Sequence, residues 1–371
     1  MTNLVRTLKD LIAVKSITGS PESYKIIDYV ETFFKGTKAY VKKYERPGNK
    51  PSVVISNVPG LSFDLIMSGH LDVVPADDHM FIPKEKDGKI FGRGSCDMKI
   101  SIAVMMEIMK DLLKAGSEKR IALMLTTDEE VGGEEGVGYL VDVVGYRAKA
   151  VFMPDSGTDI RDVIVVNKGV IHLKIVSTGK SAHCSRPWEG DNAIHNLLEV
   201  CEKIAHYVEK IPYKNAKQKF DDKAGKKWRN TCVLSRISAG TATNQVPNVA
   251  EAHLDIRFTE GNKLDDLIKG IKKVAKGHNI EIATSAEATY TPLNNQYLKN
   301  YIDAVKEIIR KKPRLIRYYG ANDGPHFSKH GVPVIAARSN SGGQHSEGEW
   351  ADIKSMHDFY KICSRFIEKL N

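Results

Sequence analysis

Four short apolar runs in this sequence end in side chains that commonly bind metal ions. Each run has the composition of a strand buried on both faces of a sheet, and the carboxyl ends of parallel strands meet at one edge of such a sheet. The donors at that edge are therefore expected to lie close together. Following the runs 63–67, 121–126, 150–153 and 333–337, they are His70 and Asp72, then Asp128, Glu129 and Glu130, then Asp155, and then His345.

A further carboxylate, Asp97, follows a glycine-rich turn in the segment GRGSCDMK and precedes a predicted helix at 98–115. Oxygen and imidazole donors without thiolates suit zinc, with cobalt or manganese as alternatives. Two ions that share one carboxylate need about five protein ligands, which this set can supply. Each donor also has an ordinary explanation: a surface His-x-Asp pair, a solvated Asp-Glu-Glu loop, or an aspartate that caps a helix. The recurrence of donors at strand ends favours the metal site.

Motifs of three other chemistries are incomplete or missing. Gly179-Lys180-Ser181 resembles the end of a phosphate-binding loop, but Lys174 stands where that loop needs its first glycine. The sequence contains no GxGxxG fingerprint and no G-x-S-x-G nucleophile elbow. Kinase, dehydrogenase and serine hydrolase chemistry are therefore not expected.

The elements that must position the donors alternate between helices and short apolar strands. This order predicts an α/β domain with a mostly parallel, helix-flanked sheet. Helices are predicted at 3–15, 22–35, 98–115, 296–311 and 353–369, and strands at 53–56, 63–67, 121–126, 150–153 and 333–337.

The middle of the chain has a different pattern, with the order β-α-β-β-α-β that is typical of a small ferredoxin-like α+β domain. We therefore predict a discontinuous catalytic domain, 1–168 and 286–371, into which a domain at 169–285 is inserted. The elements of the inserted domain are predicted at 170–177, 191–209, 231–238, 249–258, 263–276 and 279–284.

Composition limits the class of protein. The chain has 371 residues, too many for one ordinary core, and 42% of them are apolar and 27% charged, as in globular proteins. No apolar run approaches the roughly 18 to 20 residues that cross a bilayer, and the amphipathic N-terminus lacks the apolar stretch of a secretory signal. The five cysteines are far apart and include no CxxC pair, which predicts free thiols and a cytoplasmic location.

The net charge of +9 allows for an anionic partner. The densest basic stretches, 210–229 and 299–317, are interrupted by acidic residues and resemble no nucleic-acid recognition signature. We therefore expect no nucleic-acid partner, and an anionic small substrate is an equally good use of a positive field.

Seven segments occur in the order found in the M20 family of metallopeptidases and deacylases, which the sequence resembles from about residue 4 to its C-terminus. They are SGHLDVVP, GRGSCDMK, TTDEEVGG, PDSG, SAHCSRPWEGDNAI, NQVPNVAEAHLDIRF and HSEGE. That family includes acetylornithine deacetylase, succinyl-diaminopimelate desuccinylase, carboxypeptidases and dipeptidases. The resemblance implies a di-metal catalytic domain and an inserted domain that serves as a lid and a dimerisation surface.

The resemblance also implies a metal-binding role for five residues. His70 and Asp155 would hold one metal ion, usually zinc. Glu130 and His345 would hold the other, and Asp97 would bridge both.

Five further residues match positions of the family that act in catalysis or substrate binding. Asp72 would orient the first histidine ligand through a hydrogen bond, and Glu129 would be the general base. His183 matches a histidine that stabilises the oxyanion across a dimer. Asn244 and Arg257 match positions that hold the carboxylate of the substrate.

We therefore predict a cytoplasmic, homodimeric di-metal hydrolase that removes an acyl group from an N-acyl amino acid or a related amide. A dipeptidase or carboxypeptidase is the alternative within this chemistry, and a catalytically silent metal-binding protein of the same fold is the alternative of another class. In the acetylornithine and diaminopimelate branches, a G-x-S-D-x-R-F loop commonly carries an arginine, where this chain has Pro325. That difference argues against the desuccinylase assignment, and the neighbouring His326 either replaces the missing donor or packs.

Overall fold

The computed structural model describes residues 3–213, 220–222 and 225–370. The chain divides into two compact units. The larger unit comprises Met1–Val165, Tyr290–Tyr318 and Asn322–Asn371, and the smaller unit comprises Val166–Thr289 and Tyr319–Ala321.

Among the described residues, the larger sheet has nine strands in the order β1-β2-β6-β3-β7-β15-β8-β13, with β14 paired to β8. The central strands β6, β3, β7 and β15 are parallel, as predicted. The sheet is mixed because β2 is antiparallel to β6, β1 to β2, and β8 to β15. The strands are β1 Tyr40–Tyr44, β2 Ser52–Ser56, β3 Ser62–His70, β6 Ile121–Thr126, β7 Arg147–Met153, β8 Asp162–Asn167, β13 Thr289–Tyr290, β14 Arg314–Tyr318 and β15 Val334–Ala336.

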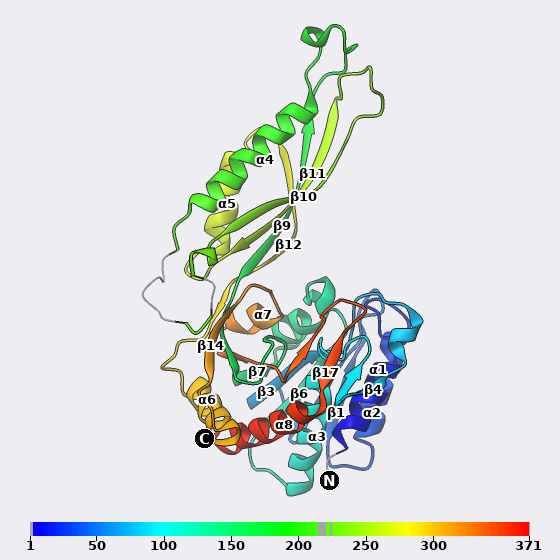
Figure 1. Cartoon of the computed structure of the whole chain (residues 1–371), viewed down its shortest axis with the longest axis vertical. Helices are drawn as coiled ribbons and strands as arrows, with labels where there is room; N and C mark the ends of the chain where they lie inside the picture. The colour runs from blue at the N-terminus through cyan, green and yellow to red at the C-terminus, as the bar shows by residue number, and fades with distance from the viewer. Residues whose placement is uncertain (1–2, 214–219, 223–224, 371) are drawn as a thin grey trace. The chain divides into compact units, whose positions relative to one another are not determined.

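Helices and helical turns cover both faces of this sheet (Figure 1). Phe152 of β7 packs against Tyr301 of α6 and Phe366 of α8, with ring centroids 5.5 and 5.7 Å away. Its neighbours Val151 and Met153 point to the opposite face, into a core shared with α7 and two π-helical turns. The helical segments are α1 Leu4–Ala13, α2 Glu22–Phe33, α3 Lys99–Ala115, the turns Glu134–Gly138 and Leu140–Val144, α6 Gln296–Ile309, α7 Gly324–Ser328 and α8 Ile353–Glu368.

A second, small sheet in the order β16-β17-β5-β4 was not predicted. It joins a hairpin that precedes the glycine-rich turn to two short segments near His345, far apart in the sequence. Each strand is two or three residues long, too short to show a hydrophobic period. The strands are β4 Lys84–Lys86, β5 Lys89–Phe91, β16 Ser341–Gly342 and β17 Trp350–Asp352.

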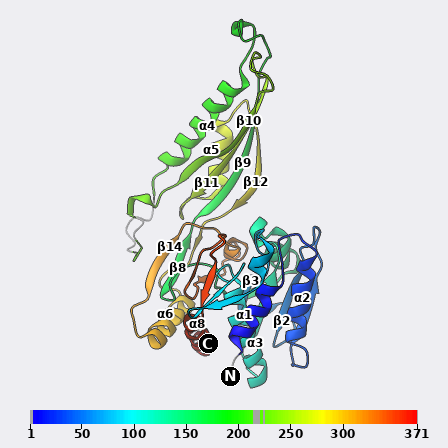
Figure 2. The same ribbon diagram turned by 45° about the vertical axis from the view of Figure 1, so that its right-hand side comes forward.

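The smaller unit has the α+β architecture predicted for the inserted domain. Its sheet has the order β10-β11-β9-β12 with antiparallel neighbours, and helices α4 and α5 lie on one face of it (Figures 1 and 2). Alternate residues of β11 are buried under these helices, as expected for a sheet that is covered on one face. The elements are β9 Gly169–Thr178, α4 Ala193–Lys210, β10 Thr231–Ala239, β11 Val249–Phe258, α5 Leu264–Val274 and β12 Asn279–Ala286.

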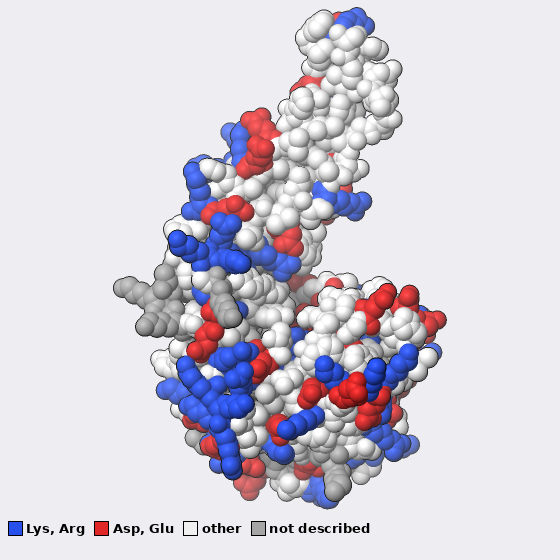
Figure 3. Space-filling model, viewed as in Figure 1, with Lys and Arg blue, Asp and Glu red and all other residues white. Residues whose placement is uncertain are grey.

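The cysteines and the charged side chains follow the expectations from the sequence. All five cysteines are free thiols. On the face shown in Figure 3, Lys and Arg side chains gather over α6 and over α4 and α5, with acidic side chains among them. Within the described residues, none of the helices has both the length and the apolar character that a membrane span requires.

Gly169, at the start of β9, provides a test of packing in the smaller unit. It is paired in register with Phe258, and a Cβ atom at this glycine would lie 2.1 Å from a ring carbon of that phenylalanine. We expect Gly169→Ala to lower the free energy of unfolding by about 1–3 kcal/mol, as overpacking does in other cores. Denaturant unfolding of Gly169→Ala, Phe258→Leu and the double variant measures the effect. Strict additivity of the two changes would contradict this packing.

Candidate metal centre

The parallel strands bring the predicted donors to one edge of the larger sheet. His70 is the last residue of β3 and lies in register with Thr126, the last residue of β6. Asp155 follows the end of β7 by two residues, and β7 is also parallel to β3. Asp97 lies between the glycine-rich turn and the first residue of α3. The side chains converge because the carboxyl ends of parallel strands share an edge.

His345 reaches the same place from the segment between β16 and β17. Its backbone has φ of +61°, a left-handed conformation that few residues other than glycine adopt. Its carbonyl oxygen accepts a hydrogen bond from Arg93 at 3.4 Å. Such conformations persist where the surrounding structure holds them, often at functional sites.

Two groups of three side chains share Asp97. One group is His70, Asp97 and Asp155, and the other is Asp97, Glu130 and His345; in each, one ligand atom per residue lies within 4.8 Å of the others. The two carboxylate oxygens of Asp97 face different histidines. Oδ1 lies 3.4 Å from His70 Nε2, and Oδ2 lies 3.1 Å from His345 Nε2.

The chemistry of these donors fits divalent cations. His70 Nε2 and Asp155 Oδ1 are buried, lie 3.7 Å apart and have no hydrogen-bond partner among the described residues. Buried polar atoms without a partner destabilise a fold unless a bound ion or water interacts with them. In addition, four carboxylates lie close together in one largely buried region, those of Asp97, Glu129, Glu130 and Asp155. A cation bound between them would offset both costs.

Burial and crowding shift the pKa values of these carboxyl groups. Burial, and then the charge of Asp97, raises the pKa of Asp155 to about 6, and burial raises the pKa of Glu130 to about 7. Burial also disfavours ionisation of Asp97, but the contacts with His345 and His70 hold its pKa well below the usual range. Asp97 is therefore the carboxylate that ionises most readily in the group.

Backbone contacts fix the orientation of His70. Its Nδ1 lies 3.0 Å from the carbonyl oxygen of Asp72 and 3.4 Å from Oδ1 of the same residue. A carbonyl can only accept, so Nδ1 donates to it, and Nε2 is the ring nitrogen that faces Asp97 and Asp155 and would bind a cation. The Asp72 carboxylate instead accepts from Thr18 Oγ1 at 2.8 Å and from the amides of Glu129 and Glu130 at 3.3 Å.

Glu129 lies beside the two groups but belongs to neither. Its Oε2 is 3.9 Å from His70 Nε2, and its side chain is 18% exposed. Burial, followed by the charges of Asp155 and Asp323, raises the pKa of Glu129 well above its usual value. A carboxyl group with a raised pKa can both take up and return a proton near neutral pH.

Sequence reasoning did not identify the residues that support Asp97. Glu349 is buried, and its Oε1 accepts from the amides of Cys96 and Asp97 at 2.9 and 3.0 Å. Arg93 donates to Oε2 of the same glutamate at 2.6 Å. Gln344 Nε2 donates to Asp97 Oδ2 at 2.5 Å. The HSEGE segment contains Glu349, but no local pattern indicates that its partner is an amide some 250 positions earlier.

Asp323, in the loop 320–327 where Pro325 stands in place of the arginine of other branches, is another buried carboxylate near Glu129. Burial and then the charge of Asp128 raise its pKa well above the usual value. Gly133 has φ of +71°, and a Cβ there would lie 2.0 Å from Asp323 Oδ1, so only glycine permits this approach. His326 is 9% exposed, with Nε2 3.4 Å from the carbonyl oxygen of Gly132. Its ring therefore packs under the loop that follows Glu129.

The remaining predicted residues lie in the smaller unit. The His183 ring contacts Ser185 Oγ at 2.8 Å and is exposed, and its backbone forms an isolated bridge to Gln245, next to Asn244. Arg257 lies on the face of β11 away from the helices, where it binds both oxygens of Asp255 at 2.7 and 2.9 Å.

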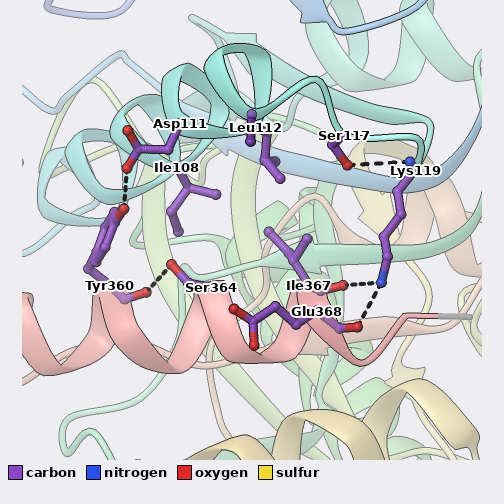
Figure 4. A pocket seen from close by; sticks show the side chains of 10 residues that line it. Ile108, Asp111, Leu112, Ser117, Lys119, Tyr360, Ser364, Ile367 and Glu368 are labelled. Atoms are coloured by element: carbon purple, nitrogen blue, oxygen red, sulfur yellow. Dashed lines mark hydrogen bonds between the residues drawn. The ribbon is translucent and has the colours of Figure 1, made fainter.

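A cavity of about 400 Å³ between α3 and α8 lacks the features of a reactive site (Figure 4). Its floor is apolar, and its polar groups are already paired. Asp111 accepts from Tyr360, and Lys119 donates to the carbonyl oxygens of Ile367 and Glu368 at 2.7 and 2.8 Å. It lies along the C-terminal half of α3, whereas Asp97 precedes the first turn of that helix.

Known proteins share the sequence pattern and the fold of this chain. Succinyl-diaminopimelate desuccinylases of Rickettsia felis and Rickettsia akari are each 26% identical to this chain, with 99% of both chains covered. A tripeptidase from Staphylococcus aureus has a similar structure, with a TM-score of 0.80, 19% identity, and coverage of 99% of this chain and 97% of that one. An M20 family metallo-carboxypeptidase from Sulfolobus solfataricus gives a TM-score of 0.79 at 20% identity, with 99% of both chains covered.

The family itself is shown by the sequence. Residues 66–369 match the profile of peptidase family M20/M25/M40, a span that includes every donor of the two groups around Asp97. The chain therefore belongs to peptidase family M20/M25/M40 and is a metal-dependent hydrolase of amide or peptide bonds.

Proposed function

We propose that this enzyme removes an acyl group from an N-acyl amino acid or a related amino-acid amide, with two divalent ions, preferably zinc, at the groups that share Asp97. The observation that carries the proposal is the position of Glu129, which lies beside both groups and belongs to neither. His70 and Asp155 would hold one ion, and Glu130 and His345 the other. Bound there, the ions would polarise the substrate carbonyl and lower the pKa of the attacking water.

The side chains of this site would then carry out the proton transfers of the reaction. Glu129 takes a proton from the attacking water and returns it to the departing nitrogen. Its raised pKa suits both steps, since a strongly acidic carboxylate would be a poor base. Asp72 fixes the tautomer of His70 through its carbonyl and holds the peptide of Glu129 through its carboxylate.

The substrate class is inferred from the relatives and from one loop. The related proteins are named desuccinylases, a tripeptidase and a carboxypeptidase, so they share the cleavage of an amide bond next to an amino-acid residue. The loop GANDGPHF at 320–327 contains no arginine or lysine, and the ring of His326 packs beneath the neighbouring loop. We therefore favour an acyl group without a second carboxylate over a succinyl group. A dipeptidase or carboxypeptidase remains the alternative in the same chemistry.

A catalytically silent metal-binding protein is the alternative of another class. The presence of Glu129 beside the donor groups disfavours it, because a binding protein has no use for a base with this pKa. The five free cysteines are consistent with a reducing, cytoplasmic location.

We also infer that a second copy of the chain completes the enzyme. Strand β10 is an edge of the smaller sheet, and its apolar side chains Val233, Leu234 and Ile237 are 56, 41 and 47% exposed. Unpaired edge strands with exposed apolar residues are surfaces for pairing with another chain. His183 would then stabilise the oxyanion in the partner's active site, and Asn244 and Arg257 would hold the substrate carboxylate. For that role Arg257 would use the donors that Asp255 leaves free.

Replacement of the base separates catalysis from metal binding. We expect Glu129→Gln to keep the metal content of the wild type and to lose about 10²- to 10⁴-fold in kcat, the usual contribution of general acid–base catalysis. Activity is measured on N-acetyl and N-succinyl amino acids and on dipeptides, and metal by elemental analysis. Glu118→Gln, an exposed residue on the turn after α3, is the matched control. Normal turnover in Glu129→Gln would exclude this residue as the base.

Removal of the shared carboxylate tests the ligand set. After reconstitution with zinc or cobalt and desalting, we expect about two metal ions per chain in the wild type. Asp97→Ala should lose both, because each group contains Asp97. Wild-type protein that binds no metal under any such condition would exclude the di-metal enzyme, whereas bound metal without turnover of any tested amide would favour the silent alternative.

Charge on the exposed edge tests the dimer. We expect Leu234→Lys combined with Ile237→Lys to give a monomer in light scattering at micromolar concentration, because paired edges would bury like charges. Val249→Lys, at a residue that is 51% exposed on β11, is the control. A wild-type monomer with full activity would contradict both the dimer and the role of His183.

A further inference from the structure

Arg338 is a fully buried arginine close to the metal-binding groups. The sequence analysis did not predict a role for it, and the proposed mechanism gives it none. It follows β15 by two residues, at the edge of the sheet where the donors converge, and is 2% exposed. A guanidinium group is costly to bury unless its donors are satisfied. Its hydrogen bonds therefore indicate why it is there.

The guanidinium group joins the two loops that carry Asp97 and Asp155. Nη1 donates to the carbonyl oxygen of Cys96 at 3.1 Å, one residue before Asp97. Nε and Nη2 donate to the carbonyl oxygen of Gly157 at 3.1 and 2.7 Å, two residues after Asp155. One planar, rigid side chain thus fixes two peptide groups that are some 60 positions apart in the sequence.

The position of Arg338 relative to the carboxylates shows that it is not a simple counter-ion. Nη1 is 4.0 Å from Asp97 Oδ1, at the limit of an ion pair, whereas its shorter contacts are all to carbonyl oxygens. Nη2 has a further, longer contact of 3.4 Å to Gln344 Oε1. Arg338 is therefore placed to fix the distance between the two loops and not to neutralise either carboxylate.

We propose that Arg338 is a positioning residue that fixes Asp97 and Asp155 relative to each other and thereby sets the affinity of the group His70, Asp97 and Asp155 for a divalent cation. This inference rests on the metal site of the proposed function. It acts through the two-point contact of the guanidinium group, which a lysine cannot reproduce.

The second metal-binding group has separate supports, so the effect of Arg338 is selective. Glu130 is held through its amide by Asp72, and His345 through its carbonyl by Arg93. Neither residue is hydrogen-bonded to Arg338. Asp97 itself has an independent anchor, since Glu349 accepts from its amide.

Cobalt titration of metal-free protein, followed by absorbance, tests this proposal without any substrate. We expect Arg338→Lys and Arg338→Met each to weaken one of two binding events by about 10- to 100-fold, the usual effect of a residue that orients metal ligands. The other event should change by no more than about twofold, as for an independent site. In an Asp155→Ala background, where the affected event is already lost, Arg338→Lys should leave the remaining event unchanged within the same limit.

Arg120→Lys is the matched control, because Arg120 also donates to two backbone carbonyls, those of Ser62 and Pro59, but is exposed and precedes β6 at the opposite edge of the sheet. It should leave both binding events unchanged. Urea unfolding of the metal-free variants shows whether they are folded.

Several results would overturn the proposal. Wild-type affinity in Arg338→Lys would mean that charge alone suffices, and equal weakening of both events would mean a general loosening of the site. Metal-free variants that do not fold would assign Arg338 to the stability of the fold instead. Failure of the proposed function is distinguishable, because the wild type itself would then bind no cobalt.

Discussion

The structure depends on the placement of one carboxylate that must serve two groups of ligands at once. Asp97 directs one oxygen to His70 and the other to His345, so an error in its backbone would disturb both contacts. The fold restrains that backbone from several directions. The turn before α3 delivers the residue and Glu349 binds its amide, while Arg338 joins the preceding carbonyl to the loop that carries Asp155. These restraints come from segments that lie at the edge of the sheet where the donors converge.

Electrostatics explains why such restraint is needed. Burial, and then the repulsion between carboxylates this close together, raises the pKa values of Asp155, Glu129 and Glu130. A divalent cation bound among these carboxylates would offset their repulsion, and its binding would displace the protons that the acids otherwise hold. The same arrangement raises the pKa of Glu129, the residue that we propose as the general base.

The two units of the chain differ in how their sheets are covered. The larger unit holds the donor groups on a sheet that is buried on both faces. The smaller unit buries only one face of its sheet, and the other face carries polar residues such as Arg257 and Asp255. Its edge strand β10 retains exposed apolar residues. One chain thus forms a sheet that is covered on both faces and carries the donor groups and, from residues in the middle of the sequence, a sheet that is covered on one face.

The sequence alone determined the long elements and the donor set. Ile121–Thr126 and Val249–Phe258 were predicted to the residue, because a run of several residues with one period is a strong local signal. Most of the side chains that gather around Asp97 were predicted because they follow such runs, whereas Asp97 itself was predicted from the glycine-rich turn before it. The short strands around the glycine-rich turn were missed, as were Arg338 and Glu349. Their partners are backbone amides and carbonyls, which carry no side-chain signature and are brought near only when distant segments fold together. Only the tertiary structure could decide those contacts.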